Sequence, residues 1–167
     1  YLHLSIRRQR QMCIRDRCDA IKLDGGKEII STVKYLTKKG IAVMGHVGLL
    51  PQFATNYKLQ GKNQKQKNKI YNDALSVSKS GVFAIVIECV VENLAKKITN
   101  NVSVPTIGIG ASKYCDGQIL VIDDMIGLSD FQPRFVKQYS KIKQAIETGV
   151  KKYSRDVKNK KFPFLII

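Results

Sequence analysis

After residue 18, short apolar runs alternate with longer amphipathic runs, and this alternation restricts the possible fold more than any other feature of the chain. The short runs predict strands at residues 20–23, 41–44, 82–87, 104–108 and 119–122. The amphipathic runs predict helices at residues 27–39, 66–80, 92–100 and 133–153. The run at 82–87 is apolar throughout, as expected of a strand buried on both faces. Such an alternation is typical of an α/β fold with parallel strands.

Five parallel strands fit either a doubly wound sheet or part of a (β/α)8 barrel, and the pattern alone does not choose between them. Polar residues and glycines follow the strands, at 24–26, 45–46, 88–89, 108–111 and 123–124. In a barrel these positions meet at the C-terminal rim, where active sites are built. We therefore favour a TIM barrel. Because a complete barrel needs about 200 residues or more, the 167 residues of this chain predict a fragment.

The first seventeen residues differ in composition from the rest of the chain. Five of the seven arginines lie there, at positions 7, 8, 10, 15 and 17, and the segment shows no sustained period of 2 or 3.6. We interpret residues 1–17 as a basic tail that is foreign to the domain or disordered, with a targeting arm as the alternative. Residues 18–167 are then the partial barrel domain.

The formal net charge of +16 raises the possibility of a nucleic-acid-binding protein. Much of this charge is lysine on the predicted helices and in the segment 58–69. No nucleic-acid-binding motif accompanies it, and the segment lacks the interleaved aromatic residues of a base-stacking surface. We therefore interpret the charge as a solvated surface and expect no nucleic-acid partner.

Cysteine spacing and hydropathy indicate a cytoplasmic protein. The four cysteines, at 13, 18, 89 and 115, fit neither a zinc site nor a dense disulfide framework. A reducing compartment is the simplest setting for such a chain. No stretch approaches the roughly 20 apolar residues that a membrane span requires, so we expect no membrane partner.

Four blocks of sequence, read in order, resemble the ketopantoate hydroxymethyltransferase family. They are AIKLDGG (20–26), VMGHVGLLPQ (43–52), FAIVIECV (83–90) and PTIGIGASKYCDGQILVIDDMIGL (105–128). Their order and spacing are similar to strands four to eight of that family, and the resemblance covers residues 18 to about 164. It implies a barrel of the phosphoenolpyruvate/pyruvate superfamily and a large homo-oligomer, commonly a decamer.

The resemblance also implies a reaction in pantothenate biosynthesis. Family members transfer a one-carbon unit from 5,10-methylenetetrahydrofolate to the 2-oxo acid 3-methyl-2-oxobutanoate, and the product is 2-dehydropantoate. A divalent metal ion, usually Mg²⁺, binds the 2-oxo acid and acts as a Lewis acid on the enolate oxygen. A carboxylate beside the acidic carbon acts as general base.

Residue by residue, the resemblance implies that Lys22 contacts the 2-oxo acid and that Asp24 holds the metal. The family usually has a glutamate at the position of Asp24, so the carboxylate here is one methylene shorter. The structural alternatives are a surface lysine for Lys22 and, for Asp24, a cap of the following helix. Capping and metal binding do not exclude each other.

The resemblance places His46 in the substrate pocket and makes Glu88 the proton acceptor. Glu88 follows six apolar residues, and burial of a carboxyl raises its pKa towards the range useful for a base. The alternative for His46 is a buried structural histidine whose nitrogens are hydrogen-bonded. The alternative for Glu88 is a charge at a helix N-terminus, stabilised by the helix dipole. Val91 stands where the family has proline.

Other candidates have weaker support. Gly108 and Gly110 allow a ligand to approach the backbone closely, although close packing of strand and helix explains them nearly as well. The pair Asp123 and Asp124 matches no metal site of the family. We interpret Cys89 and Cys115 as small apolar residues and not as nucleophiles.

Two aspartates that bind the metal and one serine that contacts the substrate, all on the first three strands of the family, have no counterpart in this sequence. We therefore expect the chain alone to be inactive and of low stability, with exposed sheet edges. The alternative functions are another lyase of the phosphoenolpyruvate/pyruvate superfamily and a basic nucleic-acid-binding module. The blocks at 45–52 and 108–118 favour the transferase.

Overall fold

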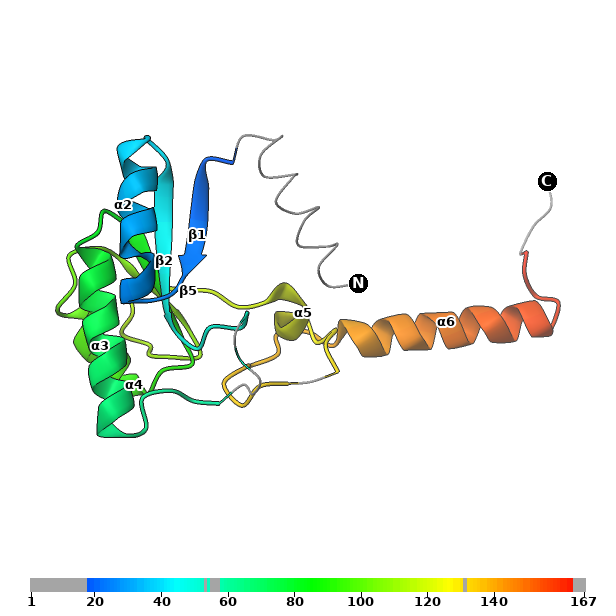
Figure 1. Ribbon diagram of the computed structural model, residues 1–167. Helices are drawn as coiled ribbons and strands as arrows, with labels where there is room; N and C mark the ends of the chain where they lie inside the picture. The colour runs from blue at the N-terminus through cyan, green and yellow to red at the C-terminus, as the bar shows by residue number, and fades with distance from the viewer. Residues whose placement is uncertain (1–17, 53, 55–57, 131, 164–167) are drawn as a thin grey trace. The chain divides into compact units, whose positions relative to one another are not determined.

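The computed structural model describes residues 18–52, 54, 58–130 and 132–163 (Figure 1). The chain divides into two compact units, residues 1–119 and 120–167. The predicted basic tail at residues 1–17 lies outside the described residues.

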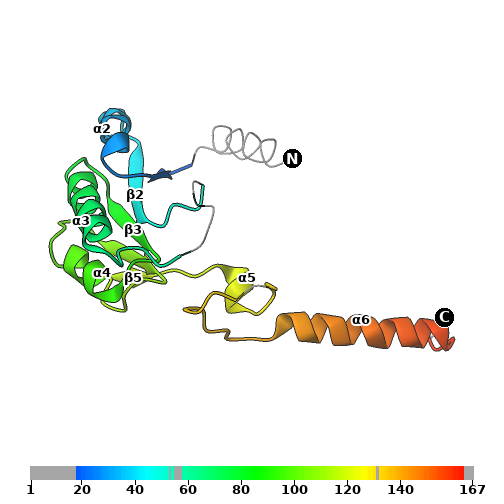
Figure 2. The same cartoon turned by 60° about the horizontal axis from the view of Figure 1, so that its bottom comes forward.

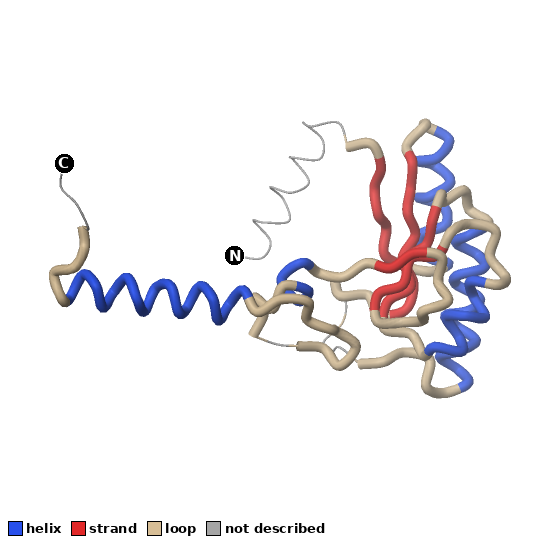
Figure 3. The backbone as a smooth tube through the Cα atoms, turned by 180° about the vertical axis from the view of Figure 1, so that it is seen from behind, coloured by secondary structure: helices blue, strands red, loops and turns tan. Residues whose placement is uncertain are grey.

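The first unit contains a five-stranded parallel sheet in the order β1-β2-β3-β4-β5. Its strands are drawn in red in Figure 3. Its strands are β1 (Ala20–Asp24), β2 (Ala42–Gly48), β3 (Ala84–Glu88), β4 (Thr106–Ile109) and β5 (Gly117–Gln118). Each strand pairs with the next one along the chain, as in a barrel, whereas the strand order of a doubly wound sheet reverses at a switch point. The predicted α/β fold is confirmed, and the sheet is consistent with a partial (β/α)8 barrel.

Helices cover one face of this sheet (Figures 2 and 3). They are η1 (Lys27–Ile29), α2 (Ile30–Lys38), α3 (Gln64–Ser78) and α4 (Glu92–Thr99). Alternate strand residues point towards them, and the core between the two layers includes Val43, Val47, Ile85 and Ile87 from the strands with Val33, Ala74, Val77 and Ile98 from the helices. Gly45 lets α3 approach the sheet, because a Cβ atom there would lie 2.5 Å from Cγ1 of Val77.

The other face of the sheet carries the predicted site residues. Successive side chains of a strand point to opposite faces, so Lys22 and Asp24 alternate with Ile21 and Leu23, which are partly buried and pack against the core. The strand register places Asp24 beside His46 and Gly48 beside Glu88. The pairing of three strands therefore brings together residues that are far apart in the sequence.

The predicted strand at residues 119–122 is wrong. Strand β5 lies earlier, at Gly117–Gln118, because the Asp116 carboxylate accepts hydrogen bonds from the backbone N–H of Thr106 at 2.8 Å and from its hydroxyl at 2.9 Å. These bonds fix the start of β5 beside β4. The apolar run that follows stays half exposed, with 50% of Ile119 and 51% of Val121 accessible to solvent.

The second unit contains α5 (Ile122–Met125) and α6 (Ile142–Lys158). The helix predicted at residues 133–153 therefore begins later and ends later. Its first residues are held in another conformation, because the N–H of Tyr139 donates to the carbonyl of Met125 at 2.8 Å and that of Ile142 to the carbonyl of Ile126 at 3.0 Å. Within the described ranges, no helix is long and apolar enough to cross a bilayer.

Candidate active site

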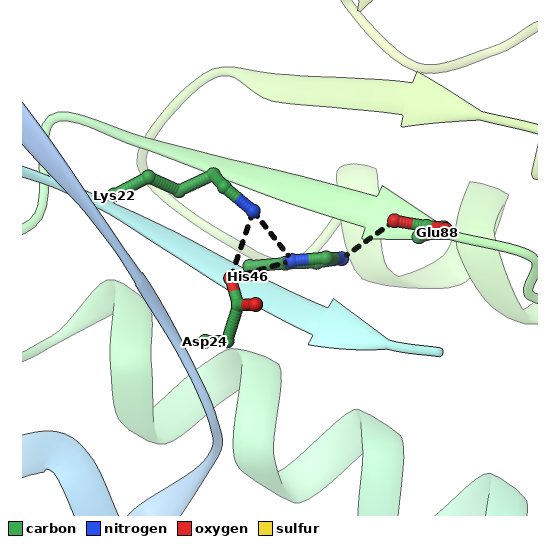
Figure 4. A network of polar contacts seen from close by, with 4 residues as sticks. All are labelled: Lys22, Asp24, His46 and Glu88. Carbon is green, nitrogen blue, oxygen red and sulfur yellow. Dashed lines mark hydrogen bonds and ion pairs between the residues drawn. The ribbon is translucent and has the colours of Figure 1, made fainter. Parts of the chain in front are cut away.

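Four predicted site residues form one network on the face of the sheet opposite the helices (Figure 4). Lys22 and Asp24 lie on β1, His46 on β2 and Glu88 at the end of β3. His46 was expected directly after its strand, but β2 continues to Gly48, so that His46 lies inside the strand. Its ring therefore lies between the two neighbouring strands and contacts a carboxylate on each of them.

The Asp24 carboxylate is nearly buried and carries two contacts on one oxygen. Its Oδ1 accepts a hydrogen bond from Nζ of Lys22 at 2.8 Å and lies 2.8 Å from Nδ1 of His46. The side chain of Asp24 is 5% exposed, whereas that of Lys22 is 45% exposed. Burial alone would raise the pKa of Asp24, but the hydrogen bonds and charges of Lys22 and His46 outweigh it and hold the pKa below its ordinary value.

The His46 ring is 1% exposed and has a contact at each nitrogen. Besides Asp24, Nδ1 lies 3.0 Å from Nζ of Lys22. Nε2 lies 3.2 Å from Oε2 of Glu88, which is within ion-pair distance. The geometry of this contact is not that of a hydrogen bond. In the described part of the chain, Nε2 is the one buried side-chain polar atom without a hydrogen-bond partner.

Glu88 is held by its backbone. Its carbonyl accepts from the N–H of Leu49 at 2.9 Å, and Gly48 lies so close that a Cβ atom there would be 2.4 Å from the same carbonyl oxygen. The next residue, Cys89, has a φ of 48°, a left-handed conformation that is uncommon outside glycine. Strained backbone is often found at functional sites.

A loop residue far from Glu88 in sequence secures the segment that follows it. The N–H of Gln60 donates to the carbonyl of Cys89 at 2.7 Å, and the carbonyl of Gln60 accepts from Val91 at 3.0 Å. These two bonds fix the direction in which the chain leaves β3. The sequence offers no signal for this role of Gln60.

Asp73 on α3 supports the turn that follows Asp24, and sequence reasoning missed it. Its carboxylate accepts from the N–H of Lys27 at 3.3 Å and from Nζ of Lys69 at 2.6 Å. It lies against Gly26, where a Cβ atom would be 2.2 Å from Cγ of Asp73. The signal was present, because Asp73 stands among the buried residues of an amphipathic helix, where an unpaired carboxylate is costly.

The other residues considered in the sequence, Gly108, Gly110 and Cys89, are not part of the network. Gly108 packs against β5, since a Cβ atom there would lie 2.9 Å from Oε1 of Gln118, which favours the close-packing interpretation. Gly110 has a φ of 58°, and its role as a pocket residue stays a prediction. Burial and then the charge of Glu88 raise the pKa of the Cys89 thiol, which suits an unreactive residue.

The network can supply one ligand to a metal ion, but it does not form a complete metal site. Among the described residues, no group of three or more His, Cys, Asp or Glu side chains could hold a metal ion. Oδ1 of Asp24 is engaged by Lys22 and His46, whereas Oδ2 forms no hydrogen bond or ion pair with a described residue. A carboxylate oxygen suits hard divalent cations, so Asp24 can supply one ligand through Oδ2.

A cavity of about 530 Å³ opens at the end of β2. Its lining combines apolar and basic side chains, with Leu49, Leu50 and Leu59 beside Lys58 and Lys62. Gly48 and Leu49 line it and also contact the carbonyl of Glu88. The cavity therefore adjoins the end of β3 that carries the carboxylate.

Comparison with known proteins gives consistent matches. The family model for ketopantoate hydroxymethyltransferase matches residues 4–164. The 3-methyl-2-oxobutanoate hydroxymethyltransferase of Pelagibacter ubique is 52% identical over 149 residues, which cover 89% of this chain and 58% of that protein. The enzymes of the same name from Rhizobium etli and Helicobacter pylori are 49% and 48% identical, over 87% and 88% of this chain and 55% and 56% of their own lengths.

The chain thus spans little more than half the length of the curated relatives that it matches. Within that span the identity is high, and the family match includes all four residues of the network. This chain belongs to the ketopantoate hydroxymethyltransferase family.

Proposed function

We propose that the chain forms part of an enzyme that transfers a one-carbon unit from 5,10-methylenetetrahydrofolate to 3-methyl-2-oxobutanoate, giving 2-dehydropantoate. The observation that carries this proposal is the network of Lys22, Asp24, His46 and Glu88, in a chain about half identical to enzymes named 3-methyl-2-oxobutanoate hydroxymethyltransferase. The network combines a partly exposed cation with two carboxylates, which is what deprotonation beside a ketone requires.

Glu88 is the proposed proton acceptor. The hydrogen on C3 of 3-methyl-2-oxobutanoate is acidic because C3 adjoins the C2 ketone. Glu88 takes this proton, and the C3–H electron pair forms the enolate. The enolate carbon then forms a C–C bond to the methylene carbon of the folate. Both C–N bonds of that carbon break and one water molecule supplies the hydroxyl group of 2-dehydropantoate, while the C3 proton and the second hydrogen of the water end on the two nitrogens of tetrahydrofolate. The Glu88 side chain is 16% exposed, so it is accessible to a substrate and partly shielded from water.

Lys22 is the proposed anchor of the substrate carboxylate. Its side chain is 45% exposed, and its ammonium group is already oriented by Asp24 at 2.8 Å. An ammonium on a flexible stem can contact an added carboxylate without leaving its first partner, because it carries three donors. Binding at Lys22 would place the 2-oxo acid on the same face as Glu88.

A divalent cation such as Mg²⁺, held by Oδ2 of Asp24, belongs to this proposal. It would polarise the oxo oxygen of the substrate. Asp24 would supply one ligand, and water or the substrate oxygens would supply others, as is common for Mg²⁺. The Lys22 and His46 contacts on Oδ1 keep the carboxylate ionised and fixed in orientation, which any cation bound to Oδ2 requires.

The cavity beside β2 is the proposed place of the folate co-substrate. Its leucines suit the aromatic part of a folate and its lysines suit the glutamate carboxylates. Leu49 lines the cavity and its N–H donates to the backbone carbonyl of Glu88, which supports a co-substrate site near that residue. His46 is also proposed as a residue of the substrate pocket. Because its ring is only 1% exposed, it offers little surface to a ligand.

A homo-oligomer is part of the proposal. Helix α6 presents half-exposed apolar side chains at spacings of four, four, three and four residues: Ile142, Ile146, Val150, Tyr153 and Val157. Such a stripe is typical of a helix that packs against another surface. Sedimentation of the enzyme that contains this chain tests the assembly. A cytoplasmic location is also proposed, and the three described cysteines, Cys18, Cys89 and Cys115, are all free thiols.

Deuterium exchange at C3 of the 2-oxo acid tests the proposed function without the folate. The enzyme that contains this chain should replace the C3 hydrogen of 3-methyl-2-oxobutanoate in D2O, and the methyl doublet in the proton spectrum should collapse. Addition of 5,10-methylenetetrahydrofolate should then give 2-dehydropantoate. Absence of both exchange and product would contradict the proposal, and exchange without product would retain the base and reject the donor.

A further inference from the structure

Strand β4 adds apolar side chains to the face of the sheet that carries the network. Thr106 of β4 is fully buried on the helix side, where its hydroxyl lies 2.9 Å from the hydroxyl of Thr99 on α4. Because successive side chains of a strand point to opposite faces, Ile107 and Ile109 point away from the helices. Both are partly buried, and neither belongs to the core between the sheet and the helices.

Ile109 is the neighbour of Glu88 on the next strand. The register of β3 and β4 pairs Glu88 with Ile109 and Val86 with Ile107. Paired strands lie about 4.8 Å apart, so the branched side chain of Ile109 stands beside the carboxylate. The N–H of Cys89 donates to the carbonyl of Ile109 at 2.9 Å and holds the two strand ends together. Val86, which is 2% exposed, and Ile107 form an apolar layer next to this pair.

The order of side chains across the sheet matches the order of groups in a branched 2-oxo acid. The ammonium of Lys22 lies on β1, the carboxylate of Glu88 on β3 and the alkyl side chain of Ile109 on β4. In 3-methyl-2-oxobutanoate the carboxylate comes first, the ketone follows, and C3 carries two methyl groups. An acid with its carboxylate at Lys22 and C3 beside Glu88 therefore directs its methyl groups towards β4.

We propose that Ile109 determines the specificity for the branch at C3, because its side chain forms the wall against which the two methyl groups lie. The preferred substrate is then a 2-oxo acid with a short alkyl branch at C3. This inference rests on the proposed function, since the role of Glu88 as proton acceptor defines where C3 lies. It adds a limit on the size of the alkyl group, which the network of polar residues does not supply.

The ratio of two C3 exchange rates tests this role in the enzyme that contains this chain. The two acids are 3-methyl-2-oxobutanoate and racemic 3-methyl-2-oxopentanoate, whose branch is longer by one methylene. In Ile109→Val the ratio of kcat/KM for the longer acid to that for the shorter acid should rise about tenfold, because valine leaves room for the methylene. Both rates are measured on one preparation, so the ratio does not depend on the fraction of the variant that is folded.

Ile87→Val is the matched control. Ile87 precedes Glu88 on β3, is fully buried and packs in the core on the helix side. It loses the same methylene, so it should lower stability and leave the ratio unchanged. Ile109→Phe is the converse variant. It should reduce kcat/KM for 3-methyl-2-oxobutanoate relative to 2-oxobutanoate, which has one methyl group fewer, by about tenfold or more.

The outcomes separate this inference from the proposed function. If the wild type exchanges C3 normally, an unchanged ratio in Ile109→Val, or an equal change in Ile87→Val, would overturn the role of Ile109 and leave the proposed function in place. If the wild type exchanges neither acid, the proposed function is contradicted and the role of Ile109 falls with it.

Discussion

Oδ1 of Asp24 lies 2.8 Å from Nδ1 of His46, across the register pair that joins β1 to β2. The two residues are 22 positions apart in the sequence, and the pairing of parallel strands makes them neighbours. Glu88 reaches the other side of the same ring from β3. The site therefore depends on the register of three strands, and a change at Asp24, His46 or Glu88 should alter the contacts of the other two residues.

Replacing Glu88 by glutamine should abolish the proton transfer and leave substrate binding nearly intact. Glutamine keeps the size of the side chain but is not a base, so kcat should fall by about 10²- to 10⁴-fold. The dissociation constant of 3-methyl-2-oxobutanoate, measured by calorimetry, should change little. Glu92→Gln, an exposed carboxylate at the start of α4, is the matched control and should keep full turnover. Normal C3 exchange in Glu88→Gln would assign the base to another residue.

Two amide variants of His46 separate positioning from substrate contact. An asparagine amide nitrogen reaches the place of Nδ1 and can keep the bond to Asp24, whereas a glutamine amide nitrogen reaches that of Nε2 and Glu88. Since the ring contacts Asp24 on one side and Glu88 on the other and each variant keeps only one of these contacts, both variants should lower kcat, by about 10- to 100-fold, as is common for residues that orient a functional group. KM for the 2-oxo acid should change little. A rise in KM with kcat unchanged would show direct contact with the substrate.

Acid should weaken the fold in part through Asp24. Lys22 and His46 hold the pKa of its carboxyl below the ordinary value despite burial. A carboxyl whose pKa is lower in the folded than in the unfolded chain stabilises the fold above the unfolded value, about 3.9, and loses this contribution as the pH falls through the folded pKa. Urea unfolding below about pH 5 should therefore show a steeper loss of stability in the wild type than in Asp24→Asn. Thr106 similarly lowers the pKa of Asp116, so some slope should persist in the variant.

The elements predicted correctly are those whose signal is local. The apolar run before Glu88 and the glycines after α2 and α3 mark β3 and the helix ends within a few residues. The run at 119–122 misled because apolar composition indicates a strand only where a partner strand is available, and here the Asp116 carboxylate moves the pairing to Gly117–Gln118. A local pattern does not contain that information.

The residues of the site could be predicted from the sequence, but the contacts between them could not. Lys22, Asp24, His46 and Glu88 could be named from the resemblance of their motifs, and the structure brings all four together. The contact of His46 with both carboxylates depends on strand register, which a motif does not give. The support from Gln60 comes through backbone bonds, and these are independent of the side chain that the sequence reports.

Gly48 should tolerate no side chain. Its φ is +99° and a Cβ atom would lie 2.4 Å from the carbonyl oxygen of Glu88, so Gly48→Ala requires the backbone of β3 to move. Overpacking of this kind costs about 1–3 kcal/mol, and the movement should also lower turnover. Gly149→Ala on α6 is the matched control, because nothing lies within 4 Å of its Cβ position. Alanine there should raise helix stability by about 0.8–1.0 kcal/mol. Equal unfolding midpoints for Gly48→Ala and the wild type would contradict this account.

The two lysines of the cavity beside β2 should matter for the folate and not for the 2-oxo acid. Lys58 and Lys62 line the cavity that adjoins the end of β3, and the glutamate end of a folate is anionic. Lys58→Ala and Lys62→Ala should each raise KM for 5,10-methylenetetrahydrofolate several-fold, because each removes a contact worth about 1 kcal/mol. The KM for 3-methyl-2-oxobutanoate and the rate of C3 exchange should not change, since neither depends on the cavity. Lys65→Ala, on the first turn of α3 and outside the cavity lining, is the matched control. The effect of the two cavity lysines should weaken with added salt, whereas equal effects of all three substitutions would indicate general attraction by the positive surface and would contradict a folate site at the end of β2.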